Sequence, residues 1–337
     1  MTNKVDFIKL PEQSKINAFI EAATRKALPS VAIEKDWWVT AVLRALFTLP
    51  YAENLSFKGG TSLSKCWNLI ERFSEDIDIA VDREFLGFSG ALSKTQISDR
   101  LRRAACSFVR EKLWIDLQKQ LETSGLNAGD FSVKVNITPI TTTDPEIIEV
   151  EYHSLFDEID YIKRKVIVEV SGRSMNEPLQ AVQLQSMIDE VFIDEDFIEK
   201  PFSIQAVVPQ RTFIEKICLV HEEFAKPQKL IRTERMSRHL YDLARITDFS
   251  VAEEALKNKE LYHSVIEHRR MFIGLKDFDY NTLMPKTINI IPPDNVIAQW
   301  QQDYETMQHT MIYGKSLSFS KLIEKIRQLN DRINQID

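Results

Sequence analysis

The stretch from Lys58 to Val81 combines two features that could do chemistry together. It opens with a run of small residues, Gly59, Gly60, Thr61 and Ser62. Glycines at the head of a helix let a phosphate approach the backbone and the helix N-terminus closely. The stretch closes with Asp76 and Asp78 on a predicted strand, where residues two apart share one face and can hold Mg²⁺ against phosphates. A phosphate cradle followed by a metal-binding pair predicts a nucleotidyl-transfer site.

Each half of this stretch also has a purely structural interpretation. A glycine pair can form a plain turn, and Ser-Glu-Asp-Ile-Asp can be a solvated edge strand, because short motifs often occur by chance. The order of turn, helix and acidic strand favours a site. Ile77, Ile79 and Val81 alternate with the acidic positions, which predicts a buried strand face that fixes the carboxylates in register.

A third carboxylate lies in a later strand-like run. Glu169 is a lone acid within the β-branched stretch 166–170, and burying it is costly unless it is paired or bound to a metal. Alternatively, it faces solvent on a half-exposed strand or pairs with Lys165 or Arg173. Two acids on the preceding predicted strand are a second choice of third ligand, Glu149 and Glu151.

The composition is that of an ordinary soluble protein. Of the 337 residues, 44% are apolar and 28% are charged. The net charge of −7 argues against a surface coated in basic residues for nucleic acid, but it leaves room for a local basic groove. No signal peptide is recognisable at the N-terminus, and the apolar run 37–43 is too short to span a bilayer. Three cysteines without metal-like spacing predict buried free thiols in a reducing cytoplasm.

The hydrophobic pattern divides the chain into an α/β half and a helical half. Helices are predicted at 13–28, 33–49, 61–70 and 98–121, and strands at 77–81, 131–137, 147–153 and 166–170. The second half has apolar stripes at helical spacing in 212–224, 300–311 and 319–333, which predict core positions. Gly314 is predicted to stop the helix before it, and Ser318 or Ser320 to cap the last one.

Polar residues of the helical half have two interpretations as well. Lys216 could be a solvated charge or could neutralise a triphosphate in the transition state. Arg238 and Asp242 are four residues apart, so a helix-surface ion pair is the plain alternative to a functional role. A basic run of Lys226, Lys229, Arg232, Arg235 and Arg238 could attract a triphosphate or an RNA backbone, or could be a solvated helix with ion pairs.

The glycine and aspartate stretch resembles the first motif of the AbiEii toxin family, within the nucleotidyltransferase superfamily. KGGTSLSK and RFSEDIDIAV carry the resemblance, and Gly60-Thr61 stands for the Gly-Ser pair of the superfamily motif. The gap to Asp76 is longer than in the simplest superfamily members and is similar to the spacing in this toxin family. Further matching segments cover most of the chain: 33–38, Thr212 with Glu215 and Lys216, Arg238 with 241–243, and residues between Trp300 and Gly314.

This resemblance implies an α+β fold and a set of site residues. The fold would be a nucleotidyltransferase-type mixed sheet flanked by helices (1–204), with a C-terminal helical domain (205–337) that completes the nucleotide site. The implied metal ligands for Mg²⁺ or Mn²⁺ are Asp76, Asp78 and Glu169, and the catalytic set adds Lys216 and Asp242. The implied nucleotide-binding residues are Lys58, Gly59, Gly60, Thr61, Ser62, Ser74, Lys216 and Arg238.

The resemblance also implies a reaction. A metal-dependent nucleotidyltransferase toxin would move a nucleotide from an NTP to an acceptor, preferably RNA at the 3′ end of tRNA, and cause growth arrest or phage defence. A cognate antitoxin of the type IV kind would act without necessarily binding the toxin. Two alternatives stay open: transfer to a small molecule or protein, and a nucleotide-binding signalling protein without turnover.

Overall fold

The computed structural model describes residues 6–74, 76–136, 146–157, 162–175 and 177–336. Contacts within the chain define two units. The first comprises Met1–Cys66 and Glu75–Ala206, and the second comprises Trp67–Ser74 and Val207–Asp337. The boundary expected from the sequence puts Trp67–Ser74 in the first domain, whereas in the structure these residues belong with the second unit.

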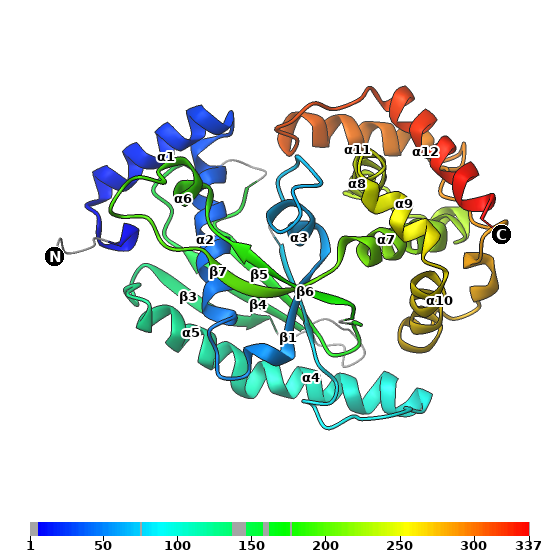
Figure 1. The fold of residues 1–337 in the computed structure, drawn as a ribbon, viewed down its shortest axis with the longest axis horizontal. Coiled ribbons are helices and arrows are strands. Elements are labelled where there is room, and N and C mark those ends of the chain that lie inside the picture. The colour runs from blue at the N-terminus through cyan, green and yellow to red at the C-terminus, as the bar shows by residue number, and fades with distance from the viewer. Residues whose placement is uncertain (1–5, 75, 137–145, 158–161, 176, 337) are drawn as a thin grey trace. The chain divides into compact units, whose positions relative to one another are not determined.

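The first unit is built on a mixed sheet, as predicted. Its strands are β1 (Leu55–Lys58), β2 (Asp76–Val81), β3 (Phe131–Asn136), β4 (Glu146–Tyr152), β5 (Lys165–Ser171), β6 (Leu179–Leu184) and β7 (Phe202–Val207). They are ordered β3-β4-β5-β2-β1-β7-β6 (Figure 1). Strand β2 runs parallel to β5 and antiparallel to β1. The helices of this unit are α1 (Glu12–Lys26), α2 (Ser30–Leu46), α3 (Gly59–Lys65), α4 (Arg102–Phe108), α5 (Trp114–Thr123) and α6 (Met187–Val191).

The second unit is helical in its described part, which confirms the predicted α+β class. Its helices are α7 (Pro209–Phe224), α8 (Ser237–Ile246), α9 (Ser250–Lys257), α10 (Lys259–His268), α11 (Ile297–Thr310) and α12 (Phe319–Asn334). The predicted stripes are core: Trp300, Tyr304 and Ile326 are fully buried. Helix α7 begins with Pro209 at its first position, where the missing N–H costs no hydrogen bond.

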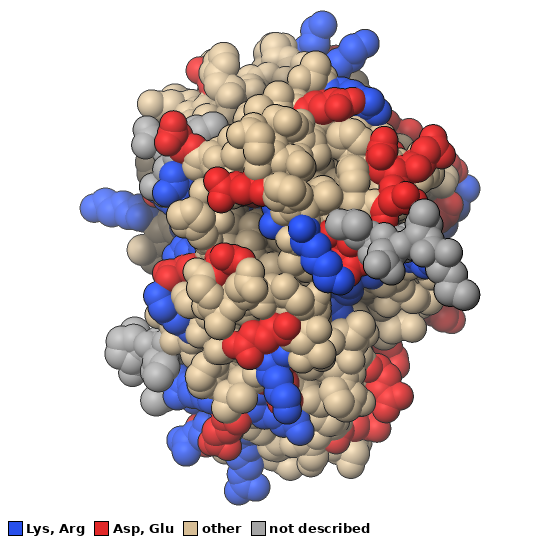
Figure 2. All heavy atoms as spheres, turned by 90° about the vertical axis from the view of Figure 1, so that its left-hand side faces the viewer, with Lys and Arg blue, Asp and Glu red and all other residues tan. Residues whose placement is uncertain are grey.

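Charged side chains of both signs are scattered over the face of the molecule that Figure 2 shows. In Figure 2 acidic and basic groups are interspersed over the visible face, consistent with the net charge of −7. The free cysteines are Cys66, Cys106 and Cys218, of which the last two are buried. None of the helices in the described ranges is both long and apolar enough to span a bilayer.

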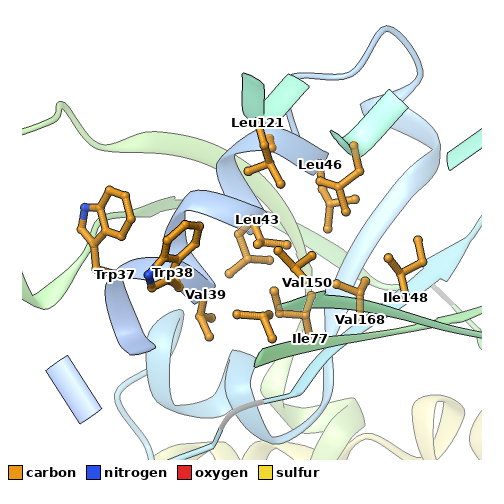
Figure 3. Close-up of a cluster of buried hydrophobic side chains, with 14 of the residues drawn as sticks. Trp37, Trp38, Val39, Leu43, Leu46, Ile77, Leu121, Ile148, Val150 and Val168 are labelled. Atoms are coloured by element: carbon orange, nitrogen blue, oxygen red, sulfur yellow. The ribbon is translucent and has the colours of Figure 1, made fainter. Parts of the chain in front are cut away.

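The core of the first unit lies between one face of the sheet and helices α2 and α5. Figure 3 shows Leu43 and Leu46 of α2 and Leu121 of α5 beside strand residues Ile77 and Val168. In β2 the predicted alternation holds, because Ile77, Ile79 and Val81 are buried while the two aspartates are half-buried. Since side chains alternate along a strand, the acids share the face opposite to this core.

Several of the predicted helix and strand boundaries differ from those in the structure. Helix α3 ends at Lys65 rather than at Ile70. The helix predicted at 98–121 instead runs from Gln96 to Thr123 and includes two π-helical stretches. Strands β1, β6 and β7 were not predicted, and the end of the strand predicted at 131–137 lies outside the described residues.

Gly314 does not stop a helix, because α11 already ends at Thr310. Its lack of a side chain has another reason. A Cβ at this position would lie 2.0 Å from Oε2 of Glu71, so the two segments could not approach as they do. Ser318 takes the N-cap position of α12, although its side chain makes no capping hydrogen bond.

We predict that Ile33→Ala destabilises the protein by about 2–5 kcal/mol, the usual loss for a buried aliphatic side chain with the cavity that it leaves. Ile33 is fully buried in α2. The matched control is Ile20→Ala in α1, where 48% of the side chain is exposed and the change should stay within about 0.5 kcal/mol. Denaturant unfolding measures both, and equal losses would contradict the assigned core.

Candidate functional site

Three charged residues line up across the centre of the sheet. Asp78 on β2 is paired in register with Lys58 on β1 and with Glu169 on β5. Residues in register on neighbouring strands point to the same face, so these side chains form one row. All three are half-buried. The structure thus brings Glu169 beside Asp78, as expected from the sequence for a third ligand.

Asp76 lies on the same face, two residues before Asp78. The hydroxyl of Thr61 donates a hydrogen bond to the backbone oxygen of Asp76 at 2.5 Å, and that of Ser62 donates to the backbone oxygen of Gly59 at 3.0 Å. Both hydroxyl residues are buried. Their side chains therefore fix α3 against the start of β2, which leaves the backbone as the part of α3 that a phosphate could use.

Gly59 is required by its contact with Asp78. Its φ is +78°, a region that L side chains rarely adopt. A Cβ at this position would lie 1.9 Å from Oδ2 of Asp78. The carboxylate of Asp78 thus lies directly against the backbone at the head of α3.

The donor chemistry of this face fits Mg²⁺. Among the residues with described positions, no group of three or more His, Cys, Asp or Glu is arranged to hold a metal ion. Mg²⁺ does not need such a group, because it commonly binds one or two carboxylates and completes its shell with water and substrate phosphates. Asp76 and Asp78 are such a pair.

The alternative third ligands are engaged elsewhere. Glu149 pairs with Lys165 at 2.9 Å, and Glu151 pairs with Lys134. The first pair also means that Lys165 has a partner other than Glu169. Glu169 is therefore the carboxylate that the sheet register favours.

The second unit contains a buried cluster of opposite charges. Asp242 on α8 is fully buried and accepts hydrogen bonds from Arg72 through both oxygens, at 2.7 and 2.8 Å. Nζ of Lys216 on α7 lies 2.9 Å from Oδ2 of the same carboxylate. Arg72 was not predicted, and its position two residues before Ser74 within the acidic motif was the available signal. Lys216 was expected on a polar helix face, whereas its side chain is buried.

The protonation of this cluster follows from burial and from neighbouring charges. Burial acts to raise the pKa of Asp242, but Arg72 and Lys216 outweigh it and hold that pKa far below its usual range. Burial lowers the pKa of Lys216, and Asp242 opposes this only in part. Burial and the charges of Lys216 and Arg238 keep the pKa of His239 well below 6.5. The cluster thus has more positive than negative charge and suits an anion.

Thr212 contributes a hydroxyl close to Lys216 along α7. It lies one turn earlier on α7, and its hydroxyl oxygen is buried without a hydrogen-bond partner in the part of the chain that the structure describes. Buried polar groups nearly always have a partner. The hydroxyl of Thr212 is therefore a candidate donor one turn from Lys216.

The basic run between α7 and α8 is partly structural. Lys226 and Arg232 each lie 2.7 Å from Oε2 of Glu223, which is 1% exposed. For these two cations the structure favours the ion-pair interpretation. Arg232 therefore should not be mutated in a test of RNA binding, because its loss would leave a buried acid poorly compensated.

Comparison with known proteins identifies the class of fold and then the family. The structure is similar to that of MenT4, a nucleotidyltransferase toxin from Mycobacterium tuberculosis, with a TM-score of 0.56 and 15% identity over 97% of this chain and 91% of that one. It also matches JHP933 from Helicobacter pylori, with a TM-score of 0.37 and 14% identity over 90% of this chain and 91% of that one. The first match shows the fold of a nucleotidyltransferase toxin.

The family follows from the sequence. The profile described as "Nucleotidyl transferase AbiEii toxin, Type IV TA system" matches residues 41–325. The chain therefore belongs to the AbiEii nucleotidyltransferase toxin family, as the motif at Lys58–Val81 suggested. A comparison with curated proteins gave no match.

We predict that Gly59→Ala lowers the free energy of unfolding by more than the strain of its positive φ alone would. Gly87 has a φ of +86° and no atom within 4 Å of the point that a Cβ would occupy, so Gly87→Ala measures the conformational cost alone, about 1–2 kcal/mol. Gly59→Ala adds the collision with Asp78 and should cost more. In a double-mutant cycle, Asp78→Ala should recover that excess. Unfolding free energies that are purely additive would show that the contact is not there.

We predict that Asp242→Ala destabilises the protein more than Lys216→Met does. Asp242→Ala leaves two buried cations without their carboxylate and should cost about 3–5 kcal/mol. Lys216→Met leaves Asp242 paired through both oxygens with Arg72 and keeps an apolar stem, so it should cost much less. Chemical denaturation of both variants measures the difference, and a larger loss for Lys216→Met would overturn the assigned pairing.

Proposed function

We propose that this protein transfers a nucleotide from an NTP to RNA. The observation that supports it most is the row formed by Lys58, Asp78 and Glu169, with Asp78 lying against the backbone of Gly59. Asp78 thereby lies next to the N-terminus of α3. The carboxylate could hold a metal, and the helix N-terminus could bind phosphates. The acidic strand and the glycine turn each have a purely structural explanation. The contact between Asp78 and Gly59 supports treating them as one site.

The first unit would hold the metal and the nucleotide. Asp76 and Asp78 would serve as metal ligands. Glu169, expected from the sequence as the third ligand, would have to move its side chain to join them, because no group of three such residues is arranged to hold a metal in the described part of the chain. A bound Mg²⁺ ion supplies charge neutralisation on the phosphoryl group and lowers the pKa of an attacking hydroxyl. Glu169 or Asp78 accepts the proton that the acceptor hydroxyl loses. Backbone N–H groups of Gly59 and Gly60 bind phosphate oxygens, Lys58 contributes a positive charge, and Ser74 contacts the nucleotide.

The second unit would stabilise the leaving pyrophosphate. Lys216 provides the charge, Arg238 adds to it, and Asp242 holds the amine in place. Arg72 keeps Asp242 ionised, so the amine is oriented by a carboxylate rather than by a neutral acid. The unpartnered hydroxyl of Thr212 supplies one more donor on the same helix. Fixed charges that meet developing negative charge are usually the largest source of catalysis in phosphoryl transfer.

RNA is the acceptor that the family membership favours, with the 3′ end of tRNA as the specific hypothesis. A type IV antitoxin would then counteract the toxin without necessarily binding it. With a net charge of −7, few exposed cations would carry the RNA contacts.

The test offers the purified protein labelled NTPs with total RNA, with cell-extract protein and with small molecules. We expect label in RNA, in a Mg²⁺-dependent reaction. Label in protein or in small molecules instead would refute the RNA acceptor but keep the transferase. No label in any fraction, from folded protein that binds NTP, would refute the transferase itself.

We predict that Asp76→Asn and Asp78→Asn each abolish label transfer while the protein stays folded. Amides keep the shape of the side chains but lose the charge that a divalent metal requires. Glu149→Gln is the matched control, because this acid lies on β4 of the same sheet but pairs with Lys165. Near wild-type turnover of either aspartate variant would refute the metal-ligand assignment.

We predict an alkaline limb in the pH profile that is set by Lys216. Its pKa is lowered from 10.5 by burial, so the charged amine should be lost as pH rises through a value below 10.5, and activity should fall with it. Lys216→Arg keeps its charge at high pH and should retain part of the activity without this limb. An identical limb in the Arg variant would assign the titration to another group.

A further inference from the structure

The second unit contains an open cavity of about 280 Å³. It lies between the end of α9, the start of α10, the turn at 284–286 and Ile336, so all of its described lining residues belong to this one unit. None of them is part of the proposed nucleotide site. Cavities that bind small molecules commonly measure about 300–1,000 Å³, so this one suits a ligand of modest size.

The floor of the cavity is apolar. Its buried or half-buried lining residues are Leu256, Tyr262, Met284, Pro285 and Ile336. The hydroxyl of Tyr262 donates to the backbone oxygen of Leu283 at 3.1 Å, so the polar atom of this side chain is satisfied within the protein. A lining of this kind favours the hydrocarbon part of a ligand over a hydrated ion, because burial removes apolar surface from water.

The mouth of the cavity is basic. Lys259, His263 and Lys286 line it and are exposed to solvent. Within the described part of the chain, none of these three side chains has a hydrogen bond or an ion pair, and none of the described lining residues is acidic. By contrast, Lys257 at the end of α9 pairs with Glu253 at 2.6 Å. In a protein with a net charge of −7, unpaired basic groups around an apolar cavity would attract a small anion.

The backbone at Lys286 adopts a conformation that lysine does not favour. Residues 284–287 form a turn in which the N–H of Thr287 donates to the backbone oxygen of Met284 at 3.3 Å. Pro285 takes the second place of this turn and Lys286 takes the third, with a φ of +79°. A positive φ at the third place is typical of glycine or asparagine. Lysine therefore does not help the turn to form, which supports a role for its side chain at the cavity.

We propose that this cavity binds a small amphipathic anion, a carboxylate attached to a short apolar chain or ring. The apolar part would lie against Leu256 and Tyr262, and Lys259 and Lys286 would bind the carboxylate at the mouth, with His263 as a further donor. Both halves of the ligand are needed, because a hydrated ion gains nothing from the floor and a neutral molecule leaves the cations unpaired. The site is separate from nucleotide transfer and does not rest on the proposed function.

Calorimetric titration of the full chain with octanoate tests the proposal, with octanamide as the neutral counterpart and acetate as the anion without a chain. Phenylacetate and phenylacetamide repeat the comparison for a ring. We expect at least one of the two amphipathic carboxylates to bind, its amide to bind about tenfold or more weakly, and acetate to show no detectable binding. The affinity for the carboxylate should fall as salt is raised, because exposed charges are screened.

Lys286→Gly separates ligand binding from folding, because it removes the amine and also relieves the positive φ. We expect its melting temperature to equal or exceed that of the wild type, while its affinity for the carboxylate falls about tenfold or more. Lys259→Gln should weaken binding as well, whereas Lys321→Gln, at an exposed lysine of α12 that is not among the lining residues, should not. The proposal is overturned if neither carboxylate binds the wild type, if carboxylate and amide bind equally, or if Lys286→Gly keeps its affinity. If Lys286→Gly does not fold, Lys259→Gln decides.

Discussion

The site depends on the burial of a single strand face. Ile77, Ile79 and Val81 pack into the core, and each contributes apolar area that stabilises the unit by roughly 25 cal/mol per Å² removed from water. A shift of β2 by one residue would place these side chains on the polar face and the aspartates in the core. Hydrophobic burial therefore favours this register, which places the two carboxylates on the opposite face of the strand.

A second constraint is the cost of burying charge. Asp242 is fully buried, and a carboxylate in such a place is tolerated only because Arg72 and Lys216 surround it. The cluster has one more cation than Asp242 can neutralise. Burial disfavours this charge and lowers the pKa of Lys216. Replacing a buried ion pair as a whole by apolar side chains is often neutral for folding, so the cluster is weak evidence of a stabilising role.

Local features could be predicted from the sequence, whereas distant pairings could not. The alternation in β2, the glycine pair and the Val-rich run around Glu169 predicted the strand faces, because side-chain periodicity depends only on neighbouring residues. The pairing of Asp78 with Glu169 needs residues 91 positions apart to meet, which the sequence supported only through the family resemblance. Arg72 was missed because its partner lies 170 positions away, and its place within the acidic motif does not by itself indicate that the side chain is buried. Gly314 was misread as a helix stop for the same reason, since Glu71 is distant in sequence.

The most direct test of the central claim is a calorimetric titration with a non-hydrolysable NTP analogue, with and without Mg²⁺. We expect the wild type to bind the analogue much more tightly with the metal present. We expect Asp78→Asn to lose this metal-dependent gain and Glu149→Gln to keep it. Metal-dependent binding that survives Asp78→Asn unchanged would contradict the central claim, because the row of Lys58, Asp78 and Glu169 would then not be where nucleotide and metal meet.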